Sequence, residues 1–269
     1  PTRAPTGRAR CALVIGIDGL RPDAMSAAQV PELDSLFASG LFTLRGTTQL
    51  RGATSSAPGW ASVMTGVDAD EHGVLQNGMD NAIRLDAHPT FLSRATGAGH
   101  RVGVASEDPR VIAMLEPELA ADARGGDADE VTRAATALLA EPHIDLVFVV
   151  LEDVDDTGHA TGFSAANPIY LAAVERVDRR IGLLLEAVRA RRTFEREEWL
   201  VVAVSDHAGE GYGHGERSAP NRTIPIAYAN SRLRRGELDE RDRSHVRVAA
   251  TVLEWLAGDE PEALFPLRR

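Results

Sequence analysis

The 269-residue chain contains no lysine, and all 29 of its basic side chains are arginines. Chemistry that depends on a lysine is therefore excluded, including that of a P-loop, a protein kinase or a Schiff base. The single cysteine, Cys11, also excludes an internal disulfide and a cysteine-rich zinc site. Because Cys11 directly precedes an apolar run, we expect it to be a strand residue without a chemical role.

Long apolar runs and an excess of positive charge are missing as well. The run over 146–151 is far shorter than the roughly 20 residues of a membrane-spanning helix, so no membrane span is expected. With Asp+Glu 40 against Lys+Arg 29, the net charge of -11 argues against binding to a nucleic-acid polymer. The first residues show no secretory signal, and we expect a soluble protein, cytoplasmic unless a signal peptide has been removed.

The composition is that of a globular protein with a full hydrophobic core. Apolar residues make up 43% of the chain and charged residues 26%. We expect a flexible N-terminal tail over 1–10, which lacks periodicity, and a single domain over 11–269.

Short apolar segments alternate with amphipathic ones along the chain. Strands are expected over 12–17, 41–50, 101–105, 144–151, 199–204 and 224–229, and helices over 31–39, 58–64, 90–98, 131–140, 167–192 and 246–257. This alternation predicts an α/β fold with a mostly parallel sheet. The continuously apolar strands indicate that helices cover both faces of the sheet. The segments 66–90 and 122–130 are expected to be loops.

Three of the predicted strands are followed by acidic residues. Asp18 and Asp206 come just after their strands, and Asp155 lies four residues beyond another. Ligands of an open α/β sheet bind beyond the carboxyl ends of its strands, so these acids meet if the strands are neighbours. One such aspartate is ordinarily a turn or capping residue, but three with histidines nearby are hard to explain in that way.

Histidines accompany these acids in the sequence. His159 comes four residues after Asp155, His207 directly follows Asp206, and His214 lies in a glycine-rich segment. Carboxylates and neutral imidazoles are typical ligands of divalent first-row metals. The six candidate ligands, enough for two ions, are Asp18, Asp155, His159, Asp206, His207 and His214. The remaining histidines are expected not to be ligands: His72, His88, His100, His143 and His245.

A serine stands at the expected start of a short helix. Ser56 precedes Ala57-Pro58 and would be the N-cap residue of that helix. Its hydroxyl would face unpaired backbone N–H groups and the positive end of the helix dipole, which suits a transferred phosphoryl group. A cap without chemical function is the alternative, and the predicted metal cluster favours the catalytic interpretation.

Five segments together resemble the alkaline phosphatase superfamily, and in particular its nucleotide pyrophosphatase/phosphodiesterase-like branch. They are Asp18-Gly-Leu-Arg-Pro-Asp, Ser56-Ala-Pro-Gly-Trp with Thr65-Gly66 and His72-Gly73, Asp155-Asp-Thr-Gly-His159, Ser205-Asp-His207, and His214-Gly. The resemblance spans about residues 12–230 and implies a doubly wound α/β domain with two zinc ions. The chain is short, so we expect only a minimal cap.

The resemblance also implies a role for each candidate residue. Asp18, Asp206 and His207 would hold one ion together with the nucleophile. The second ion would be held by Asp155, His159 and His214. Ser56 is selected as the nucleophile over Thr54 and Ser55, because it stands nine residues before the Thr-Gly pair.

The sequence departs from the family pattern near the nucleophile. Gly59 stands where the branch commonly has an asparagine that binds a phosphoryl oxygen, and Asn77, Arg51 or Arg222 are the candidates to replace it. Trp60 stands where sulfatases of the superfamily have an arginine, which argues against maturation of Ser56 to formylglycine.

The sequence thus predicts a hydrolase of small-molecule phosphate esters, either monoesters or diesters. It would act through a phosphoseryl intermediate on Ser56 with two divalent metal ions, and the mixed nitrogen and oxygen ligands favour zinc. A metal-dependent phosphomutase of the same superfamily and a non-catalytic metal-binding module are the alternatives. Because histidine ligands must be neutral, activity is expected to fall below about pH 6. The oligomeric state is left open.

Overall fold

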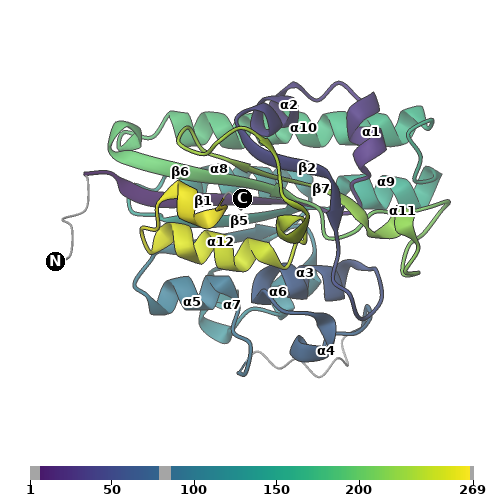
Figure 1. The fold of residues 1–269 in the computed structure, drawn as a ribbon, viewed down its shortest axis with the longest axis horizontal. Helices are drawn as coiled ribbons and strands as arrows, with labels where there is room; N and C mark the ends of the chain where they lie inside the picture. Colours follow the sequence, from purple (N-terminus) through teal and green to yellow (C-terminus); the bar gives the residue numbers. More distant parts are fainter. Residues whose placement is uncertain (1–6, 79–85, 267–269) are drawn as a thin grey trace.

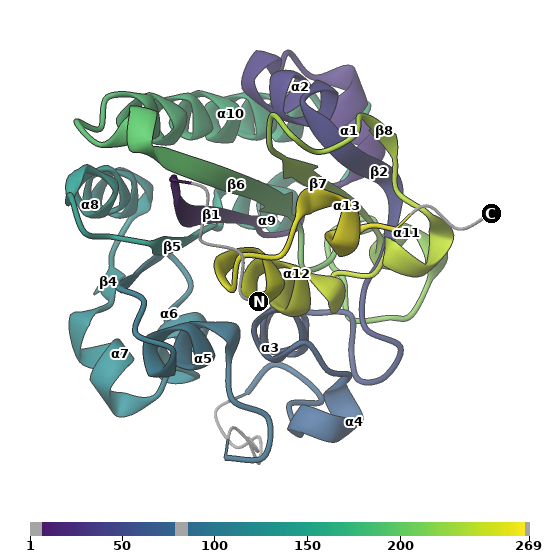
Figure 2. The same cartoon turned by 60° about the vertical axis from the view of Figure 1, so that its left-hand side comes forward.

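The centre of the molecule is a twisted sheet that lies between two layers of helices (Figures 1 and 2). The computed structural model describes residues 7–78 and 86–266, and these form one sheet of eight strands in the order β4-β3-β5-β1-β6-β7-β2-β8. The strands are β1 (Ala9–Ile17), β2 (Gly40–Thr47), β3 (Val102–Ser106), β4 (Arg124–Gly125), β5 (Leu146–Leu151), β6 (Glu197–Val204), β7 (Thr223–Ala229) and β8 (Gly236–Glu237). Strands β4, β3, β5, β1 and β6 are parallel, whereas β7 runs antiparallel to both β6 and β2.

Helices cover both faces of this sheet, as predicted. One layer contains α1 (Pro22–Ala27), α2 (Pro31–Ala38), α8 (Ala128–Ala140), α9 (Asp153–Thr161) and α10 (Pro168–Arg189). The opposite layer contains α3 (Ser56–Thr65), α5 (Phe91–Gly97), α6 (Pro109–Ala113) and α12 (Arg247–Leu256). Shorter helices are α4 (Ala69–His72), α7 (Pro117–Asp122), α11 (Ala219–Arg222) and α13 (Pro261–Leu264), with 3-10 turns at Phe194–Arg196 and Glu240–Asp242.

The continuous apolar strands follow from this two-sided cover. Successive residues of a strand point to opposite faces, and in β1 Leu13 packs into one core cluster while Val14 packs into the other. Both side chains are fully buried. A strand between two helical layers therefore has no position that favours a polar residue.

Each predicted strand and helix is found, with small shifts at its ends, but the segment 122–130 is not the loop that we expected. It contains the end of α7, the short strand β4 and the start of α8 at Ala128. Asp127 and Glu130 form a reciprocal capping box there, so these acids stabilise a helix terminus. The predicted loop 66–90 likewise contains α4, and its residues 79–85 lie outside the described range.

The predicted N-terminal tail overlaps the sheet. Strand β1 begins at Ala9, where it pairs with Glu197 of β6, so the last two residues assigned to the tail belong to the strand. Residues 1–6 lie outside the described range.

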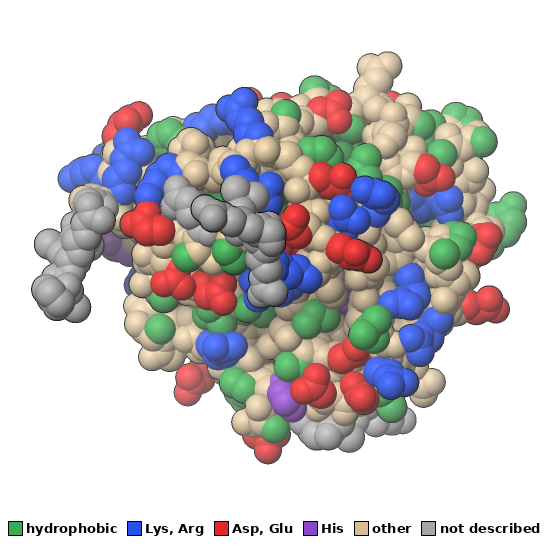
Figure 3. All heavy atoms as spheres, viewed as in Figure 1, with side chains coloured by type: hydrophobic (Ala, Val, Ile, Leu, Met, Phe, Trp, Pro, Cys, Tyr) green, Lys and Arg blue, Asp and Glu red, His purple; other side chains and the backbone are tan. Residues whose placement is uncertain are grey.

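The surface carries charges of both signs. On the face shown in Figure 3, acidic and arginine side chains are interspersed rather than separated by sign. Among the described helices, none combines the length and the apolar character needed to cross a membrane.

The sheet order brings three strand ends together. Strand β1 lies between β5 and β6, with Ile17 opposite Leu151 and Gly16 opposite Val204. The backbone N–H of Asp18 donates to the carbonyl of Leu151 over 2.9 Å, which continues the pairing one residue further. The residues that follow these strands therefore emerge at the same level of one sheet edge.

Candidate metal centre beside Ser56

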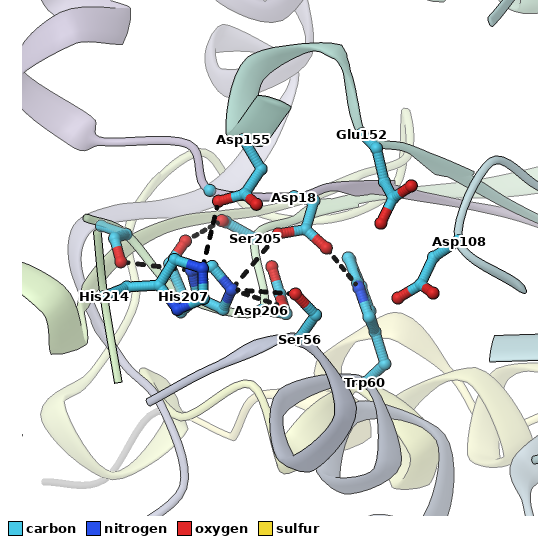
Figure 4. Close-up of polar contacts among 12 residues, drawn as sticks. Asp18, Ser56, Trp60, Asp108, Glu152, Asp155, Ser205, Asp206, His207 and His214 are labelled. Carbon is cyan, nitrogen blue, oxygen red and sulfur yellow. Dashed lines mark hydrogen bonds and ion pairs between the residues drawn. The ribbon is translucent and has the colours of Figure 1, made fainter. Parts of the chain in front are cut away.

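Asp18, Asp206 and His207 meet directly beyond the ends of β1 and β6 (Figure 4). All three side chains are fully buried. His207 Nε2 lies 3.3 Å from Asp18 Oδ1 and 3.3 Å from Asp206 Oδ2. The donor atoms of the three residues lie within 4.8 Å of one another, a spacing at which one cation could contact all of them.

Asp155, His159 and His214 form a second group. Asp155 and His159 are one turn apart on α9, and their Oδ2 and Nε2 atoms are 3.3 Å apart. His214 comes from the loop after β6 and places Nε2 3.6 Å from Asp155 Oδ1. The structure thus brings together all six of the residues predicted as metal ligands.

Backbone carbonyls fix the orientation of the imidazole rings. His159 Nδ1 lies 3.0 Å from the carbonyl of Tyr212, and His214 Nδ1 lies 3.2 Å from that of Thr54. Since a carbonyl oxygen only accepts, both Nδ1 atoms carry hydrogen, and neutral rings then present lone pairs at Nε2. These two Nε2 atoms are 2.9 Å apart, so a proton or a metal ion is required between or beside them.

The same argument applies to His207. Its Nδ1 lies 3.1 Å from the carbonyl of Ala208, so the neutral ring has its lone pair at Nε2, facing Asp18 and Asp206. The rings of His207 and His214 are in contact, with centroids 3.9 Å apart. Asp155, His207 and His214 also lie within 4.8 Å of one another, so His207 adjoins both groups.

Electrostatics favour a cation in this cluster. Burial, together with the charges of Asp206 and Asp155, raises the pKa of Asp18 well above its usual range. Burial and the charge of Asp155 do the same to the pKa of Asp206. Burial lowers the pKa of His207 to about 3, and the neighbouring His214 adds to this shift. A divalent cation would reverse the effect on the carboxylates, because it stabilises their ionised form.

Several buried oxygens of the cluster have no hydrogen-bond partner within the part of the chain that the structure describes. They are Asp18 Oδ1, Asp155 Oδ1, Asp206 Oδ1 and Asp206 Oδ2. Carboxylate oxygens without a partner are costly to bury, and metal coordination would satisfy them. The donor set therefore fits two divalent cations with mixed oxygen and nitrogen ligands.

Ser56 lies beside the first group. Its hydroxyl oxygen is 3.2 Å from His207 Nε2 and is almost fully buried (Figure 4). Ser56 is the first residue of α3, and Ser55 is the N-cap, so the predicted capping position was wrong by one residue. Thr54 contributes its carbonyl to His214. The hydroxyl that the sequence singled out is thus the one that faces the candidate ligands.

The family of the chain follows from its sequence pattern. Residues 12–219 match the family described as type I phosphodiesterase / nucleotide pyrophosphatase. The chain belongs to this family.

Solved structures of the same fold come from both phosphoesterases and sulfatases. Murine ectonucleotide pyrophosphatase / phosphodiesterase 5 is 19% identical, with a TM-score of 0.61 over 74% of this chain and 57% of that chain. A phosphonate monoester hydrolase from Silicibacter pomeroyi is 16% identical, with a TM-score of 0.65 over 95% and 75%. A 2-O GAG sulfatase is 11% identical, with a TM-score of 0.73 over 93% and 71%. These likenesses show an alkaline phosphatase-like fold.

A steric constraint explains why position 59 is a glycine and not the asparagine common in the phosphodiesterase branch. A Cβ atom at this position would lie 2.9 Å from the Cβ of Asp206 and 3.0 Å from its carbonyl oxygen. Glycine therefore allows α3 to approach Asp206 closely, and an asparagine could not be placed there without moving one of the two segments.

Asn77 is the one of the three candidate replacements that the structure places at the nucleophile segment. Its Oδ1 accepts a hydrogen bond of 2.9 Å from the backbone N–H of Ala57, the residue after Ser56. Arg51 is exposed, and Arg222 ends helix α11, where its carbonyl accepts from Thr48.

Trp60 makes a contact in the candidate site that the sequence did not predict. Its indole N–H donates to Asp18 Oδ2 over 2.9 Å, and its ring is fully buried (Figure 4). The only indication in the sequence is indirect: a tryptophan stands where the sulfatase pattern has an arginine. This hydrogen bond comes from helix α3 and orients Asp18, a candidate metal ligand.

Proposed function

We propose that this protein hydrolyses small-molecule phosphate esters through a phosphoseryl intermediate on Ser56, with two divalent metal ions, most favourably zinc. One observation carries the proposal: the Ser56 hydroxyl lies 3.2 Å from His207 Nε2, at the edge of a buried cluster of imidazoles and of carboxylate oxygens that have no hydrogen-bond partner among the described residues. Membership in the type I phosphodiesterase / nucleotide pyrophosphatase family supports the same reaction class.

Each group of ligands would hold one ion. Asp18, Asp206 and His207 would hold the ion nearer to Ser56, and Asp155, His159 and His214 the other. Bound metal ions supply Lewis acidity for the phosphoryl oxygens, the nucleophile and the leaving group. His207 Nε2 would then be a ligand, so we assign it no role as a general base.

The chain's own residues would position the reaction. Ser56 Oγ attacks phosphorus, a bond from Oγ to phosphorus forms, and the ester bond to the leaving alcohol breaks. Water then attacks the phosphoserine, which releases phosphate or a phosphate monoester and regenerates the hydroxyl. Asn77 would donate from its amide nitrogen to a phosphoryl oxygen, because its Oδ1 already accepts from Ala57.

A relative supports an essential hydroxyl side chain and the binding of a phosphate monoester. Murine ectonucleotide pyrophosphatase / phosphodiesterase 5 has been solved as an inactive threonine-to-alanine variant in complex with AMP, and it is 19% identical to this chain with a TM-score of 0.59. The present chain spans 57% of that murine chain. Whether it prefers monoester or diester substrates is decided by the paired assay below.

The test is trapping of the intermediate together with a paired assay. Enzyme turning over an aryl phosphate monoester or diester is quenched in acid, and mass spectrometry locates the phosphate. We expect phosphate on Ser56, metal-dependent turnover, no labelling of Ser56→Ala and normal labelling of the matched control Ser55→Ala. Full activity of Ser56→Ala, or full activity after complete removal of metal, would refute the proposal.

The same assays separate the alternatives. Conversion of a phosphorylated substrate to its isomer, without release of phosphate, would indicate the phosphomutase. Stoichiometric metal binding without any turnover would indicate the metal-binding module.

A further inference from the structure

His72 is a buried histidine that belongs to neither group of candidate metal ligands. It is the last residue of the short helix α4, and its side chain is fully buried. Figures 1 and 2 show α4 on the outer side of α3, the helix that begins at Ser56. His72-Gly73 is also one of the motifs by which the sequence resembles its family, and the reaction proposed above gives it no part.

The two ring nitrogens of His72 have different partners. Nδ1 accepts a hydrogen bond of 3.1 Å from the backbone N–H of Val74. Nε2 lies 2.9 Å from the hydroxyl oxygen of Ser62 on α3. Since Nδ1 accepts, the neutral ring carries its hydrogen on Nε2, which donates to Ser62. One imidazole therefore joins the beginning of the segment after α4 to the middle of α3.

That segment, residues 73–78, carries Asn77 and needs support from outside. It forms neither helix nor strand, and residues 75–78 are exposed. The carbonyl of Leu75 accepts a hydrogen bond of 2.8 Å from the backbone N–H of Ala53, shortly before the proposed nucleophile. An exposed and irregular segment opens easily, so the position of Asn77 depends on how firmly the segment is held where it begins.

Val74 is the buried end of this segment. Its side chain is 1% exposed and belongs to the core cluster that contains the apolar residues of α3. Its backbone N–H, which donates to His72, is buried as well. A buried N–H that loses its partner is costly, so without the imidazole Val74 would be driven toward solvent. His72 thus stabilises the buried position of Val74, three residues before Asn77.

The other end of α4 holds the turn before the nucleophile. The carboxylate of Asp68, the N-cap residue of α4, accepts from the backbone N–H groups of Leu50 over 2.9 Å and Arg51 over 2.8 Å. Asp68 and Glu71 also form a reciprocal capping box. A helix of four residues is too short to be stable alone, so these contacts and those of His72 fix α4 in place.

We propose that His72 is a positioning residue that holds Asn77 beside the start of α3. The inference rests on the proposed function, in which the Asn77 amide donates to a phosphoryl oxygen. His72 fixes Val74, and the segment then brings Asn77 to the N–H of Ala57, the second residue of α3, where a helix supplies no carbonyl partner. The donor is therefore in place before substrate binds, and no exposed loop has to be ordered during catalysis.

The experiment compares two substitutions that each preserve one ring position. In His72→Asn the side-chain oxygen can stand near Nδ1 and accept from Val74, whereas in His72→Gln the amide nitrogen can stand near Nε2 and donate only to Ser62. We expect His72→Gln to lower kcat about 10- to 100-fold with unchanged KM and zinc content, because a small displacement of a catalytic group has effects of this size. His72→Asn should keep most of the wild-type kcat.

A double variant separates positioning from a general loss of stability. If His72 acts through Asn77, His72→Gln combined with Asn77→Ala should be no slower than Asn77→Ala alone. Val188→Ala, a buried substitution in the opposite helical layer, is the control and should lower the melting temperature while leaving kcat unchanged. Additive losses in the double variant, or the full wild-type kcat in a folded His72→Gln, would overturn the inference.

Amide hydrogen exchange tests the same contacts without substrate. The N–H of Ala57 should exchange slowly in the wild-type protein and in His72→Asn, and faster to a similar extent in His72→Gln and Asn77→Ala. Nitrogen NMR of the wild-type imidazole should show hydrogen on Nε2 of His72, and hydrogen on Nδ1 would overturn the inference without any variant. If the wild-type protein hydrolyses no phosphate ester, the proposed function fails, while exchange and NMR still decide whether His72 holds Asn77.

Discussion

The indole N–H of Trp60, on helix α3, donates a 2.9 Å hydrogen bond to Asp18 at the tip of strand β1. This bond joins the helix that begins at Ser56 to a candidate ligand of the nearer metal ion. One side chain therefore links the helix of the proposed nucleophile to a candidate metal ligand.

Replacing Trp60 by phenylalanine removes this hydrogen bond while keeping an aromatic ring in the core. We expect Trp60→Phe to weaken metal binding at the site near Ser56 by about 10- to 100-fold, because Asp18 loses its orienting partner. Titration with zinc against a competing chelator measures the change. Unchanged affinity in a folded variant would show that the hydrogen bond has no part in metal binding.

Asn77→Ala should affect catalysis without affecting metal content. The amide nitrogen of Asn77 is expected to donate to a phosphoryl oxygen in the transition state, and loss of such a donor costs about 10²- to 10³-fold in kcat. Steady-state kinetics and elemental analysis of the same preparation measure both quantities. A loss of zinc in parallel with activity would instead assign Asn77 a structural role.

Gly59→Ala tests the close approach of α3 to Asp206. Alanine in a helix interior is ordinarily favoured over glycine by about 1 kcal/mol. Here the added Cβ would lie 2.9 Å from the Cβ of Asp206, so we expect lower zinc affinity and lower stability.

The control for this substitution is Gly97→Ala on α5, where an added Cβ meets nothing within 4 Å. That variant should be at least as stable as wild type and should bind zinc normally. Equal behaviour of the two variants in thermal unfolding would contradict the steric argument.

Metal binding should depend on pH through His159. The hydrogen bond to Asp155 raises the pKa of His159 to about 9 in the metal-free protein. Below that pH a metal ion must displace a proton, so affinity at this site should rise about tenfold per pH unit toward pH 9 and then level off. With limiting zinc, activity should therefore begin to fall at a higher pH, as the pH is lowered, than the value of about 6 that the unperturbed histidine pKa predicts.

Zinc titrations between pH 6.5 and 9.5 test this dependence, with His159→Gln as the comparison. The variant should bind zinc more weakly at high pH but with a shallower pH dependence, because its side chain releases no proton. A wild-type affinity that is constant between pH 7 and 9 would contradict the prediction.

The strand ends could be predicted from the sequence because a strand covered on both faces is apolar throughout. In β1 and β6 the first polar side chains after such runs are Asp18 and Ser205-Asp206, so the position of the site followed from the pattern. The parallel order of neighbouring strands then required Asp18, Asp155 and Asp206 to converge.

Helix α9 could not be predicted in the same way. It contains a glycine and three aspartates, and its turn structure depends on packing against α10 rather than on apolar periodicity. This helix nevertheless sets the spacing of Asp155 and His159. The contact between Trp60 and Asp18 was also beyond prediction, because it joins two segments that only the assembled sheet brings together.

The candidate ligands begin with Asp18, just after the first strand, and end with His214, beyond β6. During synthesis, a nascent chain would therefore expose isolated acids and imidazoles without a complete centre until the loop after β6 had left the ribosome. Cation uptake would be a late event of maturation, and a bound pair of ions would require that the neighbouring strands β1, β5 and β6 have already assembled side by side.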